Sequence, residues 1–165
     1  MARKTAYLGL MSAAALILSY VESLIPFFMG IPGMKLGLPN AAIVTVLYLY
    51  SWKEAALVNL VRILAAGLLF GNAFSIAFSA AGAALSLLCM QLVKRTEWFS
   101  PAGVSVTGGV AHNAGQILVA AAVVRNVRIG YYFLPLAAAG VVTGALIGVI
   151  AELLIPRLLP VTHKI

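Results

Sequence analysis

The chain has 165 residues, of which 63% are hydrophobic and 9% charged, and its mean hydropathy is +1.07. Soluble domains are about 45–50% apolar and about 25% charged, so this composition excludes a soluble domain and predicts a single transmembrane domain over residues 1–165. The formal charge of +7 comes from basic residues scattered at the ends of apolar runs, a pattern typical of a membrane topology signal and not of nucleic-acid binding.

The first expected helix follows Arg3 and Lys4 and runs from residue 5 to about 25, where Pro26 ends it. The next segment, SLIPFFMGIPGMKLGLPN over residues 23–40, is rich in proline and glycine. We expect it to form a loop in which Gly33 and Gly37 let the backbone around Lys35 approach a ligand closely. The open alternative is an interfacial loop whose lysine meets lipid phosphates.

Five further apolar runs complete an all-α bundle of six transmembrane helices. The expected ranges are 40–52 with Asn40 as N-cap, 55–70, 73–93 after a turn at Gly71-Asn72, 104–124, and 132–155 closed by Pro156. The first two ranges reach only about 20–24 Å at about 1.5 Å per residue, which is shorter than the roughly 30 Å hydrocarbon core. Short spans beside a proline-rich segment indicate a re-entrant or lid-like loop.

A cytoplasmic N-terminus agrees best with the distribution of basic residues among the expected loops. The inner group would be Arg3, Lys4, Lys53, Lys94, Arg95, Arg157 and Lys164, and the outer group Lys35, Arg125 and Arg128. This excess of inner basic residues follows the positive-inside rule and places both termini in the cytoplasm.

Arg62 is the most informative polar residue, because a charge at membrane depth is costly and is usually functional. Its helical spacing places it with Asn59 on a face of small residues. We expect it to bind an anionic group, alone or with Glu22 as an orienting partner. The alternative is a structural ion pair with Glu22, or snorkelling to the interface.

On the fifth expected helix, His112 and Gln116 are one turn apart and Asn113 lies beside them. These side chains either line a cavity or hydrogen-bond the helices together. They do not predict a metal site, because zinc requires three or four ligands and the only other histidine is His163. No cofactor is expected.

Small residues at four-residue spacing predict close helix packing. Gly140, Gly144 and Gly148 form such a stripe on the last helix, and Gly9 and Ala13 form a shorter one on the first. Packing inside the monomer is the simpler interpretation, and contact with a separate membrane subunit is the alternative.

These features resemble a known family. The sequences SYVESLIP and GMKLGLPNA, within residues 20–41, are similar to those of the Gx transporter family, often labelled heptaprenyl diphosphate synthase component I, which is related to the substrate-capture (S) components of energy-coupling-factor (ECF) vitamin transporters. The resemblance implies a bacterial cell-membrane protein with an outward-facing pocket and a first helix that meets an ATP-driven coupling module. Ala2 and Ala6 match the small-residue spacing of that helix, and Gly9 with Ala13 is a similar pair.

The predicted function is capture of a small anionic or amphipathic compound from the outer side for uptake. The chain has no aspartate and no Walker sequence, so it lacks both the aspartate-rich motifs of a prenyl synthase and a nucleotide site. The first alternative is an accessory subunit in isoprenoid or quinone metabolism or electron transfer. The second is an intramembrane enzyme that uses His112 with Glu22 or Glu152.

Overall fold

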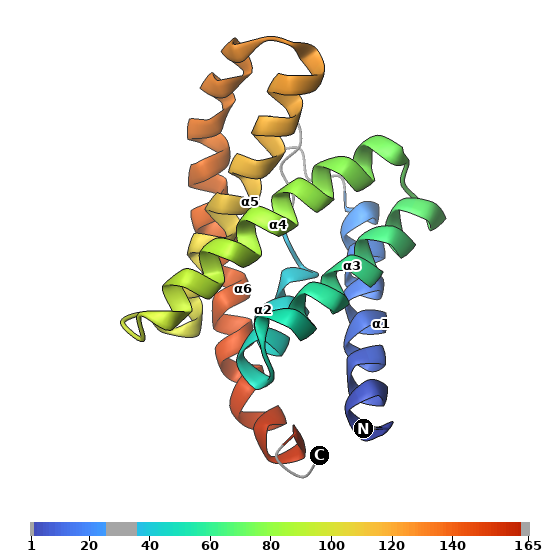
Figure 1. Cartoon of the computed structure of the whole chain (residues 1–165). Helices are drawn as coiled ribbons and strands as arrows, with labels where there is room; N and C mark the ends of the chain where they lie inside the picture. Colours follow the sequence, from blue (N-terminus) through green and yellow to red (C-terminus); the bar gives the residue numbers. More distant parts are fainter. Residues whose placement is uncertain (1, 26–35, 163–165) are drawn as a thin grey trace.

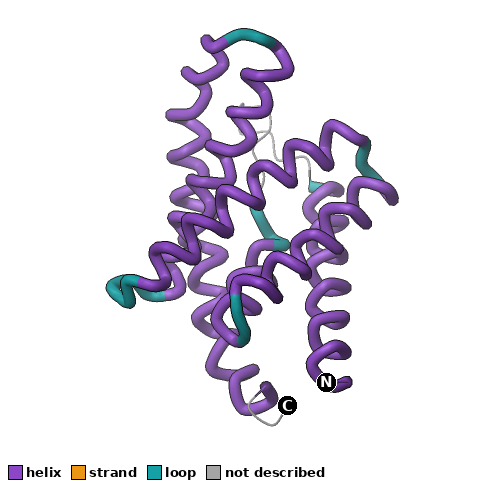
Figure 2. The backbone as a smooth tube through the Cα atoms, viewed as in Figure 1, coloured by secondary structure: helices purple, strands orange, loops and turns teal. Residues whose placement is uncertain are grey.

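The computed structural model describes residues 2–25 and 36–162, and over these ranges it is helical with no strand (Figures 1 and 2). The elements are α1 (Ala2–Leu24), α2 (Asn40–Leu49), α3 (Trp52–Leu69), α4 (Ala73–Arg95), α5 (Pro101–Val124), the 3-10 helix η1 (Val127–Tyr132) and α6 (Phe133–Thr162). The predicted all-α class is confirmed. The centre of the predicted lid, including Gly33 and Lys35, lies outside the described residues.

Four segments are long and apolar enough to cross a membrane: α1, α4, α5 and the stretch from Val127 to Pro160. This result supports the prediction of a membrane protein. α2 has only 10 residues, about 15 Å of helix, and is too short to span. The predicted range 40–52 was therefore too long, because the chain turns at Tyr50 and Ser51 starts α3 by accepting a hydrogen bond from the Lys53 amide at 3.2 Å.

Other helix ends show where local sequence signals succeeded or failed. Asn72 caps α4 and exchanges hydrogen bonds with Ser75, which confirms the turn predicted there. Asn40 was wrongly predicted as a cap, since it is the first helical residue and Pro39 occupies the cap position. α5 begins at Pro101, three residues earlier than expected, and Ser100 is its cap. The missing N–H of proline costs nothing in the first turn of a helix.

α6 does not end at Pro156 as predicted. The helix continues through Pro156 and Pro160 to Thr162. Each proline removes one intrahelical hydrogen bond, a loss that a membrane helix tolerates when neighbouring groups satisfy the freed carbonyl. The C-terminal end of α6 bends away from its upper part in Figure 1, as expected at prolines.

The short helix α2 lies at the centre of the bundle. Its first seven residues after Asn40, from Ala41 to Leu47, are all buried, consistent with a sequence that is apolar on every side. Lys94 of α4 donates a hydrogen bond to the Leu47 carbonyl at 2.5 Å and lies over the Tyr48 ring. This ammonium satisfies the carbonyl end of α2, where a positive charge is favoured.

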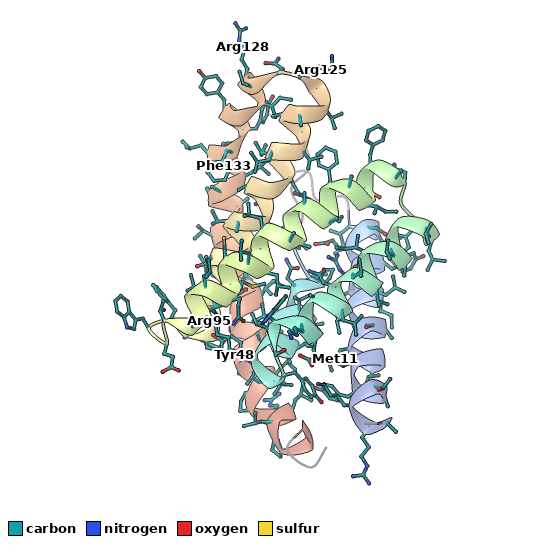
Figure 3. All side chains as sticks on the ribbon, viewed as in Figure 1. Met11, Tyr48, Arg95, Arg125, Arg128 and Phe133 are labelled. Carbon is teal, nitrogen blue, oxygen red and sulfur yellow. The ribbon has the colours of Figure 1, made fainter. Side chains whose placement is uncertain are left out.

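The other helices surround α2, and α5 packs along both α4 and α6 (Figure 1). Both ends of the described chain lie at the same end of the molecule, whereas Arg125 and Arg128 lie at the opposite end (Figures 1 and 3). Near the termini, Lys4 of α1 forms a 2.6 Å ion pair with Glu54 of α3. Hydrogen bonds from Lys4 and Ser51 lower the pKa of Glu54 to about 2, so the carboxylate is ionised at physiological pH.

The glycine stripe of α6 lies against α5 of the same chain. A Cβ atom added at Gly148 would lie 2.4 Å from the Cα of Ala102, and one at Gly144 would lie 2.7 Å from the Cα of Val106. The backbones therefore meet without room for side chains, and this stripe has no surface left for a separate subunit. Gly9 and Ala13, in contrast, are exposed on α1.

Candidate ligand-binding cavity

A cavity of about 200 Å³ lies inside the bundle, and all six α-helices contribute to its wall. The cavity lies closer to the end of the molecule opposite the termini, because the last turns of α1 and α3 and the first turns of α4 line it. Most of its lining side chains are polar or absent, as in Ser19, Glu22, Ser23, Gly37, Asn40, Arg62, Gly67, Gly71, Ser75, Ser79, Gly109, His112, Asn113, Gln116 and Thr143. Pockets for drug-sized ligands are typically about 300–1,000 Å³, so this one suits a small compound or a polar head group.

Seven of the predicted binding residues line this one cavity: Glu22, Gly37, Asn40, Arg62, His112, Asn113 and Gln116. Asn59 lies behind the wall and contacts Arg62, and Lys35 lies outside the described residues. The structure thus brings together residues from four helices and one loop that are up to 94 positions apart in the sequence (22 to 116). Their role in binding a ligand stays a prediction.

Arg62 is a buried cation held by a neutral partner. Only 8% of its surface is exposed, and its Nε and Nη2 groups donate to Oδ1 of Asn59 at 3.1 and 2.6 Å. Asn59 is itself buried and comes from the same face of α3, as the helical spacing predicted. The amide fixes one edge of the planar guanidinium without neutralising its charge, an arrangement that suits an anion in the cavity.

Glu22 connects α1 to the segment that leads into α2. Its carboxylate accepts hydrogen bonds from the backbone amides of Gly37 and, at 3.3 Å, Leu38. Gly37 has φ +75°, a left-handed conformation that favours glycine. Glu22 is also an electrostatic neighbour of Arg62, so it both positions the cavity rim and contributes negative charge near the cation.

The sequence left open whether the polar face of α5 lines a cavity or hydrogen-bonds helices together, and this face does both. His112 lines the cavity and packs on Gly82 of α4, where an added Cβ would lie 2.8 Å from the imidazole. Asn113 donates through Nδ2 to the Leu136 carbonyl at 2.6 Å and so joins α5 to α6. Gln116 lies on the cavity wall one turn beyond His112.

Hydroxyl residues on the cavity wall were not predicted as ligand contacts. Ser19 and Thr143 each donate to the carbonyl four residues earlier, Ala15 and Ala139, at 2.9 Å. Such residues are satisfied within their own helix, so nothing in the sequence requires them to face a cavity. The available signal was position: Ser19 precedes Glu22 by one turn, and Thr143 lies between two glycines of the α6 stripe.

Glu152 does not join this site. Its carboxylate accepts a hydrogen bond from the Ala102 amide at 3.1 Å, at the start of α5. His112 is ten residues further along that helix, or about 15 Å at about 1.5 Å per residue. Glu152 is therefore a cap for α5, and the hypothesis that pairs it with His112 as acid and base was wrong.

Comparison with protein families gives one match, the family described as heptaprenyl diphosphate synthase component I, over residues 11–154. The chain belongs to this family. The match confirms the resemblance to the family labelled heptaprenyl diphosphate synthase component I that residues 20–41 predicted. No curated protein and no solved structure matches the chain.

The heptaprenyl diphosphate synthase component I match covers the complete cavity. Every lining residue, from Ser19 to Thr143, falls within residues 11–154. The match therefore includes residues of all six α-helices and is not limited to one short motif.

Gly82 gives a direct test of the His112 position. Gly82→Ala is expected to push the imidazole off α4 into the cavity and to reduce ligand retention several-fold, with a smaller effect on stability because a side chain can shift. Retention is measured by native mass spectrometry and stability by thermal unfolding. Gly130→Ala is the control, since its added methyl group meets nothing within 4 Å. Equal retention by both variants would show that His112 does not face the ligand.

Proposed function

We propose that this chain is a membrane substrate-binding subunit that captures a small anionic or amphipathic compound. The observation that carries the proposal is the polar cavity with the buried Arg62 on its wall. Burying a charge in a low-dielectric interior costs free energy, so a buried arginine needs a reason to be there. Polar residues within a membrane bundle commonly mark a substrate pathway.

The proposal includes capture from the outer side of a bacterial cell membrane by a six-helix bundle with both termini in the cytoplasm. The described chain ends lie together, as this topology requires, and Arg125 and Arg128 lie at the other end (Figure 3). The predicted excess of basic residues on the side of the termini favours the cytoplasm for that side. The cavity is nearer that other end, and Gly37 and Pro39 form part of its rim. A cover formed by the loop between α1 and α2, as in ECF S components, would complete the site.

Uptake by such a subunit requires a partner, because the sequence contains no Walker motif for ATP. We propose an ATP-driven coupling module, for which α1 with exposed Gly9 and Ala13 offers a small-residue surface. The family resemblance associates coupling with a small-residue face of the first helix, and Gly9 with Ala13 is a pair similar to that face.

A second candidate function is supported by the family description. An accessory subunit of a heptaprenyl diphosphate synthase, or of quinone metabolism or electron transfer, would use the same cavity to present a substrate head group to an enzyme. The chain alone lacks aspartate for the magnesium sites of a prenyl synthase, so in this role it would not be the catalytic subunit.

Native mass spectrometry of the purified protein separates the two functions. A retained water-soluble, vitamin-like anion supports capture, and a retained polyprenyl or quinone compound supports the accessory role. Turnover of either compound by the isolated chain would contradict both. Absence of any retained or added small-molecule ligand would contradict the binding function itself.

A further inference from the structure

A second space of about 20 Å³ adjoins the polar cavity inside the bundle. Four residues line both spaces: Gly37, Asn40, Gly109 and Thr143. They belong to the segment before α2 and to α2, α5 and α6, so the two spaces have parts of three helices in common. A volume of this size holds one water-sized group.

The small space lies deeper in the bundle than the cavity. α4 begins at the end of the molecule opposite the termini, and along it the lining passes from Ser79 in the cavity to Ser86 in the small space (Figure 1). α5 runs the other way, and its lining passes from His112 in the cavity back to Ser105. Each step is seven residues (79 to 86 and 105 to 112), which keeps one helix face and covers about 10 Å at about 1.5 Å per residue. The small space thus extends the cavity towards the end where the termini lie.

Two buried serine hydroxyls line the small space without a hydrogen-bond partner among the described residues. Ser86 of α4 and Ser105 of α5 each expose only 4% of their surface. A Cβ atom added at Gly108 of α5 would lie 3.1 Å from the Oγ atom of Ser86, so this hydroxyl points from α4 towards α5. Buried hydroxyls in proteins are nearly always hydrogen-bonded, because leaving one unpaired costs free energy. The two serines therefore call for a polar group from outside the chain.

We infer that the small space is the inner subsite of the ligand cavity and takes one uncharged hydrogen-bonding group of the ligand, such as a hydroxyl or a carbonyl. A serine hydroxyl both donates and accepts, so Ser86 and Ser105 suit either group. This inference rests on the proposed function and narrows its ligand to a compact anion that is polar at both ends, with its anionic group at Arg62. An alkyl or polyprenyl end would leave both hydroxyls unpaired, so this class favours capture over the accessory role.

The test compares 3-phenylpropanoate with 3-(4-hydroxyphenyl)propanoate, and phenylacetate with 4-hydroxyphenylacetate. The members of each pair have the same carboxylate and differ by one hydroxyl at the far end of the ring. Affinities are measured by ligand-observed NMR near neutral pH, with the protein in phosphatidylcholine nanodiscs. In at least one pair the hydroxylated member is expected to bind about five- to tenfold more tightly, because only that member pairs the buried serines.

Variants assign this preference to the subsite. Ser86→Ala and Ser105→Ala should each reduce the preference, and the double variant should abolish it. Arg62→Gln should weaken both members of a pair alike and leave the preference in place, because the guanidinium meets the carboxylate that they share. Ser12→Ala is the control, since its hydroxyl donates to the Leu8 carbonyl and lines neither space.

The ligand-free double variant should keep the Tm of the wild type, because the hydroxyls that it removes have no partner among the described residues. Equal affinities within both pairs, a preference that survives in the double variant, or binding of neither pair would overturn the inference. A lower Tm with an unchanged preference would show that the serines hold a structural water only, and would also overturn it. The proposed function fails separately, when no small molecule of any kind binds.

Discussion

Replacing Arg62 by glutamine is expected to reduce affinity for the anionic ligand about 10- to 100-fold. A hydrogen bond to a charged group contributes about 1.5–3 kcal/mol, and each 1.4 kcal/mol is a factor of ten in affinity. Arg62→Lys should recover part of the loss, because it restores the charge but not the planar fork. Binding is measured by titration of the ligand that native mass spectrometry identifies, in detergent or nanodiscs.

The same variant distinguishes a binding role from a structural one through its effect on stability. Arg62 is buried beside the neutral Asn59, and a glutamine amide can still donate to that Oδ1 atom. The ligand-free variant should therefore keep a stability close to that of the wild type. The cost of burying the charge is removed together with its attraction to Glu22, and that carboxylate keeps its hydrogen bonds from the amides of Gly37 and Leu38. Lys53→Gln removes an exposed charge from the same helix and is the control. A large fall in stability with unchanged binding would show that Arg62 serves the fold and not the ligand.

Helical periodicity was sufficient to predict which polar side chains lie together at the cavity wall or directly behind it. The spacing of Asn59 and Arg62 on α3, and of His112 and Gln116 on α5, puts each pair on one face whatever the rest of the fold does. A membrane environment strengthens such predictions, because exposing a polar face to lipid is costly and the face therefore turns to the bundle interior.

The sequence could not show which faces meet, because this depends on contacts between distant segments. The carboxylate of Glu22 accepts hydrogen bonds from the amides of Gly37 and Leu38, and no local sequence pattern predicts this contact. Lys94 caps α2 across 47 positions, although its sequence context is that of an ordinary topology signal. The expectation for Pro156 was wrong because proline lowers the stability of a helix without always ending it.

The α5–α6 contact supplies the second large expected effect. Gly148→Ala is expected to destabilise the protein by about 1–3 kcal/mol, because the added methyl group would lie 2.4 Å from the Cα atom of Ala102. A backbone atom cannot rotate away as a side chain can, so the two helices must separate. For a chain of this size, the expected fall in Tm is roughly 2–12 °C, measured by thermal unfolding in detergent.

Gly9→Ala is the matched control, because it makes the same substitution in a long helix where nothing lies within 4 Å. Alanine has the higher helix propensity, by about 1 kcal/mol, so this control should have an unchanged or slightly higher Tm. The two variants therefore move stability in opposite directions although the chemical change is identical. If Gly148→Ala also raised Tm, the backbones of α5 and α6 would have to be further apart than the structure places them. Gly109 of α5 and Thr143 of α6 line the same cavity, so they would then also lie further apart. The cavity would be larger than a small head group requires.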